Sequence, residues 1–268
     1  MYFDITEKRI ENLVRSCRGL GIDTFVLDDG WFGCRKSDNS SLGDWYIDKN
    51  KFPNGLNNII SICKENGMSF GIWFEPEMIS ENSELYRRHP DWCIHTPGCA
   101  PIESRSQLVL DMARSEVVDC IYNQLAALLN EYDITYVKWD MNRNITDNGS
   151  ASLSADAQGE HAHRYILGVY SLMDRLTKAF PDVLFEGCAG GGGRFDFGIL
   201  YYMPQIWTSD DTDAVERLKI QYGTSMVYPV SAMTAHVSAC PNHQTGRITP
   251  FKTRGDIAQI CNFGYELD

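Results

Sequence analysis

The sequence predicts an α/β fold of the TIM-type (β/α)8-barrel class, and three observations lead to this prediction. Short apolar runs without polar alternation recur along the chain, and amphipathic helical patterns lie between them. Strands buried on both faces and connected by helices form parallel sheets. The chain of 268 residues holds about seven such units, and this number favours a barrel over a doubly wound sheet.

The first units are regular. A helical pattern over residues 6–19 precedes an apolar run over 24–27, and a helical stripe over 56–63 precedes a run over 69–74. In both helical patterns, apolar residues recur at the i, i+3, i+4 spacing of one helix face. A shorter run over 107–111 is expected to be the next strand of the series.

The second half continues the alternation. Predicted helices cover 117–132, 161–179 and 213–222, and predicted strands cover 135–139, 183–188, 205–208 and 233–237. Two long polar loops, 34–55 and 141–160, each follow a predicted strand. Long loops in this position are expected on the catalytic face of a barrel.

Charge and cysteine usage exclude several classes of function. A formal net charge of −12 disfavours nucleic acid and anionic membranes as partners, and no apolar run is long enough to cross a bilayer. The nine cysteines are irregularly spaced and include no C-x-x-C pair. They therefore favour reduced thiols and a cytoplasmic location. The six scattered histidines form no metal-binding pattern, so no metal is expected.

Carboxylates stand at the ends of most predicted strands, often beside a tryptophan. The segments are DDGW (28–31), WFE (73–75), KWD (138–140) and WTSDD (207–211). Because parallel strand ends meet at one rim of a barrel, these side chains are expected to surround one pocket. Carboxylates accept hydrogen bonds from hydroxyls and indoles cover the apolar face of a sugar, so the pattern favours a neutral carbohydrate.

Each of these acids has an alternative interpretation as a helix N-cap, because Asp is a favoured N-cap residue. The cap interpretation is favoured for Asp213, which directly precedes a helical pattern, and disfavoured for Asp140. Lys138 lies two residues before Asp140, so both side chains are expected on the same face of the strand. The pair either holds Asp140 ionised beside a ligand or is a structural ion pair.

The glycine run CAGGGGR (188–194) is not a phosphate loop. It lacks the Lys-Ser/Thr of a P-loop and the acidic partner of a dinucleotide fold. Its glycines are expected to let the backbone approach a ligand closely. Cys188 has an alternative interpretation as an inert core residue.

Several motifs together resemble those of glycoside hydrolase family 36, the bacterial-type α-galactosidases. They are LDDGWFG (27–33), LGDW (42–45), FPNGL (52–56), GIWFEPEMI (71–79), HPDW (89–92), VKWDMNR (137–143), CAGGGGR (188–194) and WTSDDTDA (207–214). The resemblance runs along essentially the whole chain.

The resemblance implies a role for each matching residue. Asp140 matches the family's nucleophile and Asp210 its acid/base, which implies carboxyl groups about 5 Å apart and a raised pKa for Asp210. No metal or cofactor is implied. The implied substrate-binding residues are Asp28, Asp29, Trp73, Arg105, Lys138, Cys188, Gly191 and Asp211. Asp28 and Asp29 match residues at the 4- and 6-hydroxyls of galactose, and Cys188 and Gly191 match a motif at the 2-position.

The resemblance also sets expectations for organisation and activity. Residues 1–268 are expected to form one catalytic domain with barrel strands two to eight, without the family's flanking β-domains. The expected reaction is retaining hydrolysis of terminal α-galactosides of the melibiose or raffinose type. Two alternatives remain open: galactosyl transfer to a sugar acceptor, and a carbohydrate-binding fragment without turnover. Family members of this kind often form homo-oligomers.

Overall fold

The computed structural model describes residues 3–266, in which seven strands form one sheet in the order β1-β2-β5-β6-β7-β8-β9. Neighbouring strands with defined register pair in parallel. The strands are β1 (Thr24–Leu27), β2 (Ser69–Phe74), β5 (Tyr136–Trp139), β6 (Leu184–Gly187), β7 (Gln205–Trp207), β8 (Met233–Ser238) and β9 (Asn262–Glu266). Seven parallel strands with helical connections confirm the predicted class, a (β/α)8 barrel that lacks one strand.

Helices connect the strands, and the predicted ones are confirmed. The helices are α1 (Glu7–Ser16), α2 (Asn57–Glu65), α3 (Glu84–Arg88), α4 (Ser115–Glu131), α5 (His161–Ala179), α6 (Phe197–Tyr202), α7 (Ala214–Ser225) and α8 (Phe251–Ala258). Short 3-10 turns occur at Pro90–Trp92, Gln158–Glu160 and Val230–Ala232. Sequence patterns did not indicate α8 and β9, because α8 buries only Ile257 and Ala258 and β9 is largely exposed.

The prediction that residues 107–111 form the next strand of the parallel series was wrong. Only Leu108–Val109 (β4) is extended, and it pairs antiparallel with Met78–Ile79 (β3) in a separate two-stranded sheet. A short run that is buried on both sides looks the same in either setting, because its apolar pattern reports burial and not pairing direction. The seventh strand of the parallel sheet is β9 instead.

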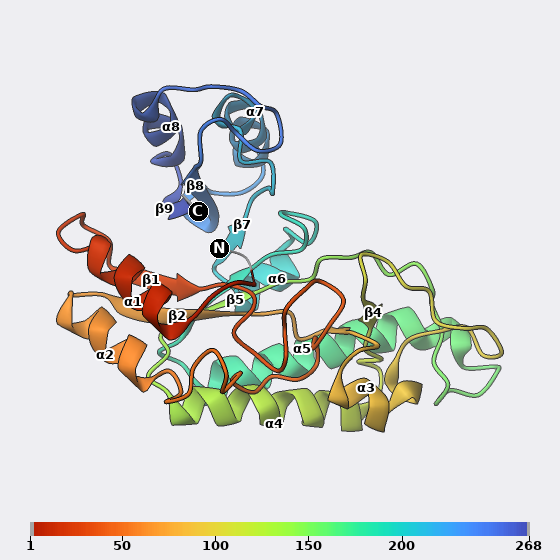
Figure 1. Cartoon of the computed structure of the whole chain (residues 1–268). Helices are drawn as coiled ribbons and strands as arrows, with labels where there is room; N and C mark the ends of the chain where they lie inside the picture. Colours follow the sequence, from red (N-terminus) through yellow and green to blue (C-terminus); the bar gives the residue numbers. More distant parts are fainter. Residues whose placement is uncertain (1–2, 267–268) are drawn as a thin grey trace. The chain divides into compact units, whose positions relative to one another are not determined.

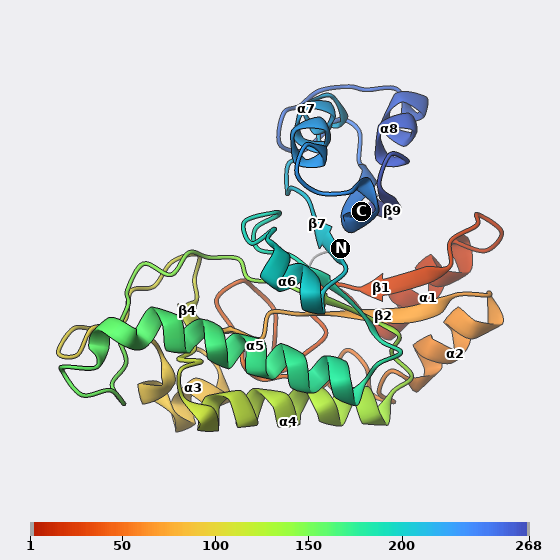
Figure 2. The ribbon, with the colours of Figure 1, turned by 180° about the vertical axis from the view of Figure 1, so that it is seen from behind.

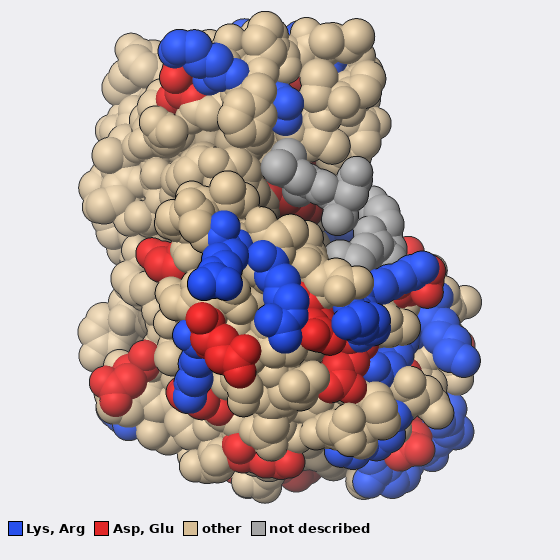
Figure 3. All heavy atoms as spheres, turned by 60° about the vertical axis from the view of Figure 1, so that its left-hand side comes forward, with Lys and Arg blue, Asp and Glu red and all other residues tan. Residues whose placement is uncertain are grey.

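The chain divides into two compact units. The larger unit consists of the chain up to Val137 together with Met141–Val183, and the smaller unit consists of Lys138–Asp140 and the chain from Leu184 onward. Within the larger unit, α4 and α5 lie side by side, and so do α1 and α2 (Figures 1 and 2). On the face shown in Figure 3, acidic and basic side chains are intermixed and form no extended patch of one sign.

An aromatic cluster forms much of the core of the larger unit near the ends of β1 and β2. Its members are Trp31, Phe32, Trp45, Trp73 and Phe74, with ring centroids 4.5 to 6.3 Å apart. The indole of Trp31 donates to the carbonyl of Trp73 at 3.0 Å. Most of the contacts are tilted or edge-to-face, which is the favoured geometry for aromatic pairs.

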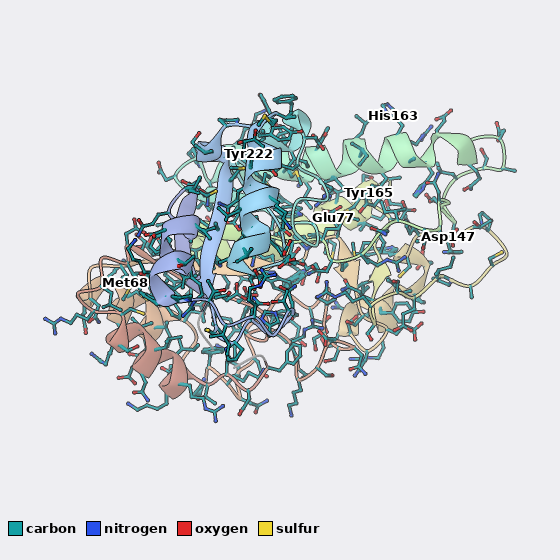
Figure 4. The ribbon with its side chains drawn as sticks, turned by 90° about the horizontal axis from the view of Figure 1, so that it is seen from above. Met68, Glu77, Asp147, His163, Tyr165 and Tyr222 are labelled. Carbon is teal, nitrogen blue, oxygen red and sulfur yellow. The ribbon has the colours of Figure 1, made fainter. Side chains whose placement is uncertain are left out.

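A buried polar network fixes the loop between β5 and α5 in the larger unit. Asp111 accepts hydrogen bonds from Ser150 and from His161 Nε2, the latter at 3.0 Å, and all three side chains are buried. Figure 4 shows Tyr165 close to Glu77, and its hydroxyl donates to Glu77 Oε2 at 2.7 Å. Buried polar groups are tolerated when they are paired in this way.

In the smaller unit, α8 packs beside β8 and β9, and α7 packs beside α8. Ala235, Val237 and Ala258 form a small apolar core there, with Cys261 packed against it. Among residues 3–266, no helix has the length and apolar composition needed to cross a membrane.

Two helical glycines give opposite predictions for alanine substitution. A Cβ at Gly168 in α5 would lie 1.7 Å from the Met112 carbonyl oxygen, whereas a Cβ at Gly223 in α7 would meet nothing within 4 Å. We expect Gly168→Ala to destabilise the fold by at least about 1–3 kcal/mol through overpacking. Gly223→Ala should stabilise it by up to about 1 kcal/mol because alanine has the higher helix propensity. Urea unfolding of both variants measures this difference, and equal effects would contradict the packing described for α5.

Candidate active site

Two strand-end carboxylates lie in the smaller unit. Asp140 directly follows β5 and is buried, with 6% of its surface exposed. Asp210 lies three residues beyond the end of β7 and is exposed. Both positions agree with the prediction from sequence, because the residues after parallel strands lie at the carboxyl edge of a sheet.

Cys188 brings these carboxylates into one electrostatic environment. Burial raises the pKa of the Cys188 thiol well above its usual value, and the negative charges of Asp140 and Asp210 raise it further, against the opposing charge of Lys138. A hydrogen bond with Asp140 acts in the same direction. The thiol is therefore protonated and donates to the Asp140 carboxylate.

Lys138 and Asp140 thus act on the same side chain, as expected for positions i and i+2 of a strand. Lys138 also lies over the ring of Trp207, with Nζ 5.7 Å from the centroid. Trp207 in turn donates its indole N–H to Asp210 Oδ1 at 2.8 Å. A cation, a thiol, an indole and two carboxylates are therefore grouped within one compact unit.

The glycine run packs against the backbone that carries Asp210. Gly191 has a positive φ of 87°, and a Cβ there would lie 2.8 Å from Ser209 Cα and 2.9 Å from Asp210 N. A Cβ at Gly192 would lie 2.8 Å from the Thr208 carbonyl oxygen. The close neighbour that requires these glycines is the protein's own segment after β7, whereas the sequence suggested a ligand.

The N-cap alternative holds for Asp213 alone among the strand-end acids. The Asp213 side chain accepts from the amides of Val215 and Glu216 at the start of α7. The next N-cap residue after Asp29 is Leu56, and the next after Asp140 is Ala157. Asp211 has a local structural contact, since it accepts a hydrogen bond from the Asp213 amide at 3.0 Å.

In the larger unit, Asp29 forms a bidentate ion pair that sequence reasoning did not anticipate. Arg35 Nε and Nη2 donate to Asp29 Oδ1 and Oδ2 at 3.0 and 2.8 Å. Burial raises the pKa of the Asp29 carboxyl, although Arg35 opposes this shift. Asp28 is exposed and accepts from the Asp29 amide. The ion pair fixes the orientation of Asp29.

Trp73 and Arg105 also lie in the larger unit, in different surroundings. Trp73 belongs to the aromatic cluster and is 3% exposed. Arg105 is exposed and, with Ser106, forms the centre of a two-residue turn in which Ser104 and Gln107 exchange backbone hydrogen bonds. Both central residues have positive φ, 53° and 57°. Such turns favour Asn-Gly, so Arg-Ser holds the backbone in a strained conformation.

Two buried cations near the predicted residues were missed from the sequence. Arg35 lies in a long polar loop, and Arg217 lies inside α7, where its spacing looks like that of an ordinary surface residue. No local pattern identifies either of them. All nine cysteines are unbridged, and the described residues include no group of three or more His, Cys, Asp or Glu side chains arranged to hold a metal ion.

A parallel β/α sheet with paired strand-end carboxylates, an indole and a lysine has the composition of a glycosidase site. Comparison with known families agrees: the Melibiase family model matches residues 1–268. The chain belongs to the Melibiase family.

Curated relatives match along the whole chain. It is 59% identical over 267 residues to α-galactosidase AgaA of Geobacillus stearothermophilus and 57% identical to α-galactosidase Mel36A of Lactobacillus acidophilus. Each match covers 100% of this chain but only 37% and 36% of those relatives. The chain therefore spans about a third of the length of these proteins.

Solved structures show the same fold. The chain superimposes on the GH36 α-galactosidase AgaA variant in complex with raffinose with a TM-score of 0.98 at 58% identity, covering 100% of this chain and 37% of that chain. For the galactosidase domain of AgaSK, the TM-score is 0.93 at 55% identity, covering 99% of this chain and 36% of that chain.

The strained turn predicts a stabilising substitution. Ser106→Gly should raise the free energy of unfolding by about 0.5–1 kcal/mol, because glycine adopts positive φ without the penalty paid by serine. Ser106→Ala serves as the control and should give no gain, since alanine keeps the same strain. Chemical denaturation of both variants measures the effect. A gain with alanine as large as that with glycine would show that the backbone is not strained there.

The glycine run over 188–194 predicts two destabilising substitutions of unequal size. Gly190 and Gly191 both have positive φ, but only a Cβ at Gly191 would overlap the backbone of Ser209 and Asp210. Gly190→Ala should cost about 1–2 kcal/mol from strain alone. Gly191→Ala should cost about 1–3 kcal/mol more, because the loop and the segment after β7 must separate. Thermal unfolding compares the two, and equal losses would argue against this packing.

Proposed function

We propose that this chain carries the catalytic residues of a retaining α-galactosidase, with Asp140 as nucleophile and Asp210 as acid/base. The observation that supports this most directly is the loop after β6. Its first residue, Cys188, donates its amide to the Trp139 carbonyl beside Asp140, and its Gly191 packs against the backbone of Asp210. The relatives named α-galactosidases, which match the whole chain at more than half identity, support the substrate class.

The two carboxylates differ in a way that suits different roles. Asp140 is buried and accepts from the Cys188 thiol, so its carboxylate is held in a poorly hydrated site. In the first step, this carboxylate attacks the anomeric carbon of the galactoside and forms a covalent ester. The bond to the leaving oxygen breaks as Asp210 transfers its proton to that oxygen.

Asp210 is exposed, so water can reach it in the second step. The Asp210 carboxylate removes a proton from water, and the resulting hydroxide attacks the anomeric carbon. The ester bond to Asp140 breaks, galactose leaves with net retention, and Asp210 is protonated again. Lys138 places a positive charge beside Cys188, the same side chain that Asp140 contacts.

The remaining residues are proposed to bind galactose. Asp28 and Asp29 accept hydrogen bonds from hydroxyls, and the Arg35 ion pair leaves Asp29 with further lone pairs for this purpose. Trp73, Arg105, Cys188, Gly191 and Asp211 complete the proposed set. The strained turn at Arg105 is compatible with such a role, because strained backbone clusters at ligand-binding sites. The substrate class is terminal α-galactosides such as melibiose and raffinose.

Hydrolysis of p-nitrophenyl α-galactoside tests the proposal. Asp140→Ala should abolish turnover, and Asp210→Ala should lower kcat/KM by about 10²–10⁴-fold, the usual contribution of a general acid. Asp256→Ala is a matched control, because this aspartate forms only an exposed ion pair with Lys252 in the same unit. It should leave the rate unchanged.

Turnover that survives Asp140→Ala would reject this nucleophile. Binding of galactosides by the wild-type chain without any turnover would instead support a carbohydrate-binding module. Product analysis with melibiose separates hydrolysis from transfer, since hydrolysis yields galactose and transfer yields a longer saccharide.

A further inference from the structure

Arg217 is a buried cation whose bonding differs from that of the other arginines. It lies in α7 and is 3% exposed. Its Nη1 donates to the Ser209 carbonyl at 2.8 Å, its Nη2 to the Thr234 carbonyl at 2.6 Å, and its Nε to Gln221 at 3.2 Å. Within the described residues it forms no salt bridge. A buried guanidinium without a carboxylate partner is costly, so its position requires an explanation.

The contacts of Arg217 converge on the segment that leads to Asp210. Ser209 immediately precedes Asp210, so the hydrogen bond to its carbonyl fixes the peptide from which Asp210 extends. The Thr234 carbonyl belongs to β8, so the guanidinium connects that strand with the end of β7. Its central carbon also lies 4.8 Å from the ring centroid of Trp207.

Trp207 connects Arg217 with the carboxylate itself. The guanidinium lies against the indole, and the indole N–H donates to Asp210 Oδ1 at 2.8 Å. The His236 ring packs on the same indole, with the two ring centroids 4.5 Å apart. Gln244 donates to the Asp210 carbonyl at 2.8 Å and holds the backbone on the other side. One carboxylate oxygen of Asp210 is therefore held by an indole that is itself held in place.

We propose that Arg217 is a positioning residue for Asp210, acting through the Trp207 indole and the Ser209 carbonyl. The inference rests on the proposed function, in which Asp210 protonates the leaving oxygen. A general acid works only when its proton points at that oxygen, and a misplacement of about 1 Å can cost about 10²-fold in rate. A purely structural arginine would affect all substrates alike.

Two substrates distinguish a positioning role of Arg217 from a purely structural one. Melibiose has a poor, sugar leaving group that needs a proton from Asp210, whereas the fluoride of α-galactosyl fluoride departs without one. For Arg217→Met in the chain, we expect kcat/KM to fall about 10–100-fold for melibiose and less than about 3-fold for the fluoride. For each substrate, kcat/KM reports the steps up to and including glycosylation, because deglycosylation follows that step and is the same for both substrates.

Arg247→Met is the matched control. Arg247 pairs with Asp213 and Glu216 at the start of the same helix, at 2.5 and 3.2 Å. In the described part of the chain it forms no hydrogen bond, ion pair or ring contact with Trp207 or Ser209. Arg247→Met should change kcat/KM for both substrates by the same factor or leave both unchanged. Trp207→Phe is the second test variant, because it removes the N–H donor to Asp210 and leaves Arg217 in place. It should show the same selective loss on melibiose.

A selective loss of kcat/KM on melibiose in both Arg217→Met and Trp207→Phe supports the inference. An equal loss of kcat/KM on both substrates, or no loss on either, in a folded variant overturns the inference. If Arg217→Met does not fold by circular dichroism, Trp207→Phe decides by the same criterion. A wild-type chain that turns over neither substrate rejects the proposed function itself, and this result is distinct from an active wild type whose variants lose both activities equally.

Discussion

The close approach of two backbone segments governs the smaller unit. The glycine run after β6 lies so near Ser209 and Asp210 that a single methyl group at Gly191 would collide with both. Cys188 begins the run, and its amide donates to the Trp139 carbonyl at 2.7 Å. One short loop therefore contacts the ends of β5 and β7, which carry Asp140 and Asp210. Because these contacts involve backbone atoms, only glycine lets the loop reach them.

Buried ionisable side chains have three different kinds of partner among the residues described. Arg35 neutralises Asp29 through a bidentate pair, and His161 shares Asp111 with Ser150 inside a closed network. Arg217 instead uses carbonyl oxygens and an indole face. The first arrangement compensates opposite charges locally, and the second satisfies a buried carboxylate with hydrogen bonds. The third leaves a positive charge near Asp210 and Asp211. Burial lowers the pKa of the Arg217 guanidinium, and the charges of Cys261, Asp211 and Asp210 oppose this shift only in part.

The larger unit combines a closely packed core with a strained turn at Arg105 and Ser106. The aromatic cluster and the Asp111 network hold β2, β4 and the loop after β5, and Asp147 in that loop accepts from the amide and hydroxyl of Thr96. Against this frame, Arg105 and Ser106 adopt positive φ without glycine. A rigid surround is what allows such a turn to persist, because strain of about 1–3 kcal/mol per residue must be offset elsewhere.

The sequence alone determined the fold class, most of the helices and strands, and the positions of Asp140 and Asp210 after β5 and β7. Apolar periodicity and strand-end carboxylates are local features, and they also identified Asp213 as an N-cap. Pairing direction is not local, so residues 107–111 were misassigned and β9 was missed. The partner of Asp140 was decided by the tertiary structure alone, because Cys188 follows a different strand. Arg35 and Trp207 lie only six and three residues from Asp29 and Asp210, but their side-chain directions depend on the packing around them, so the sequence pattern did not identify them.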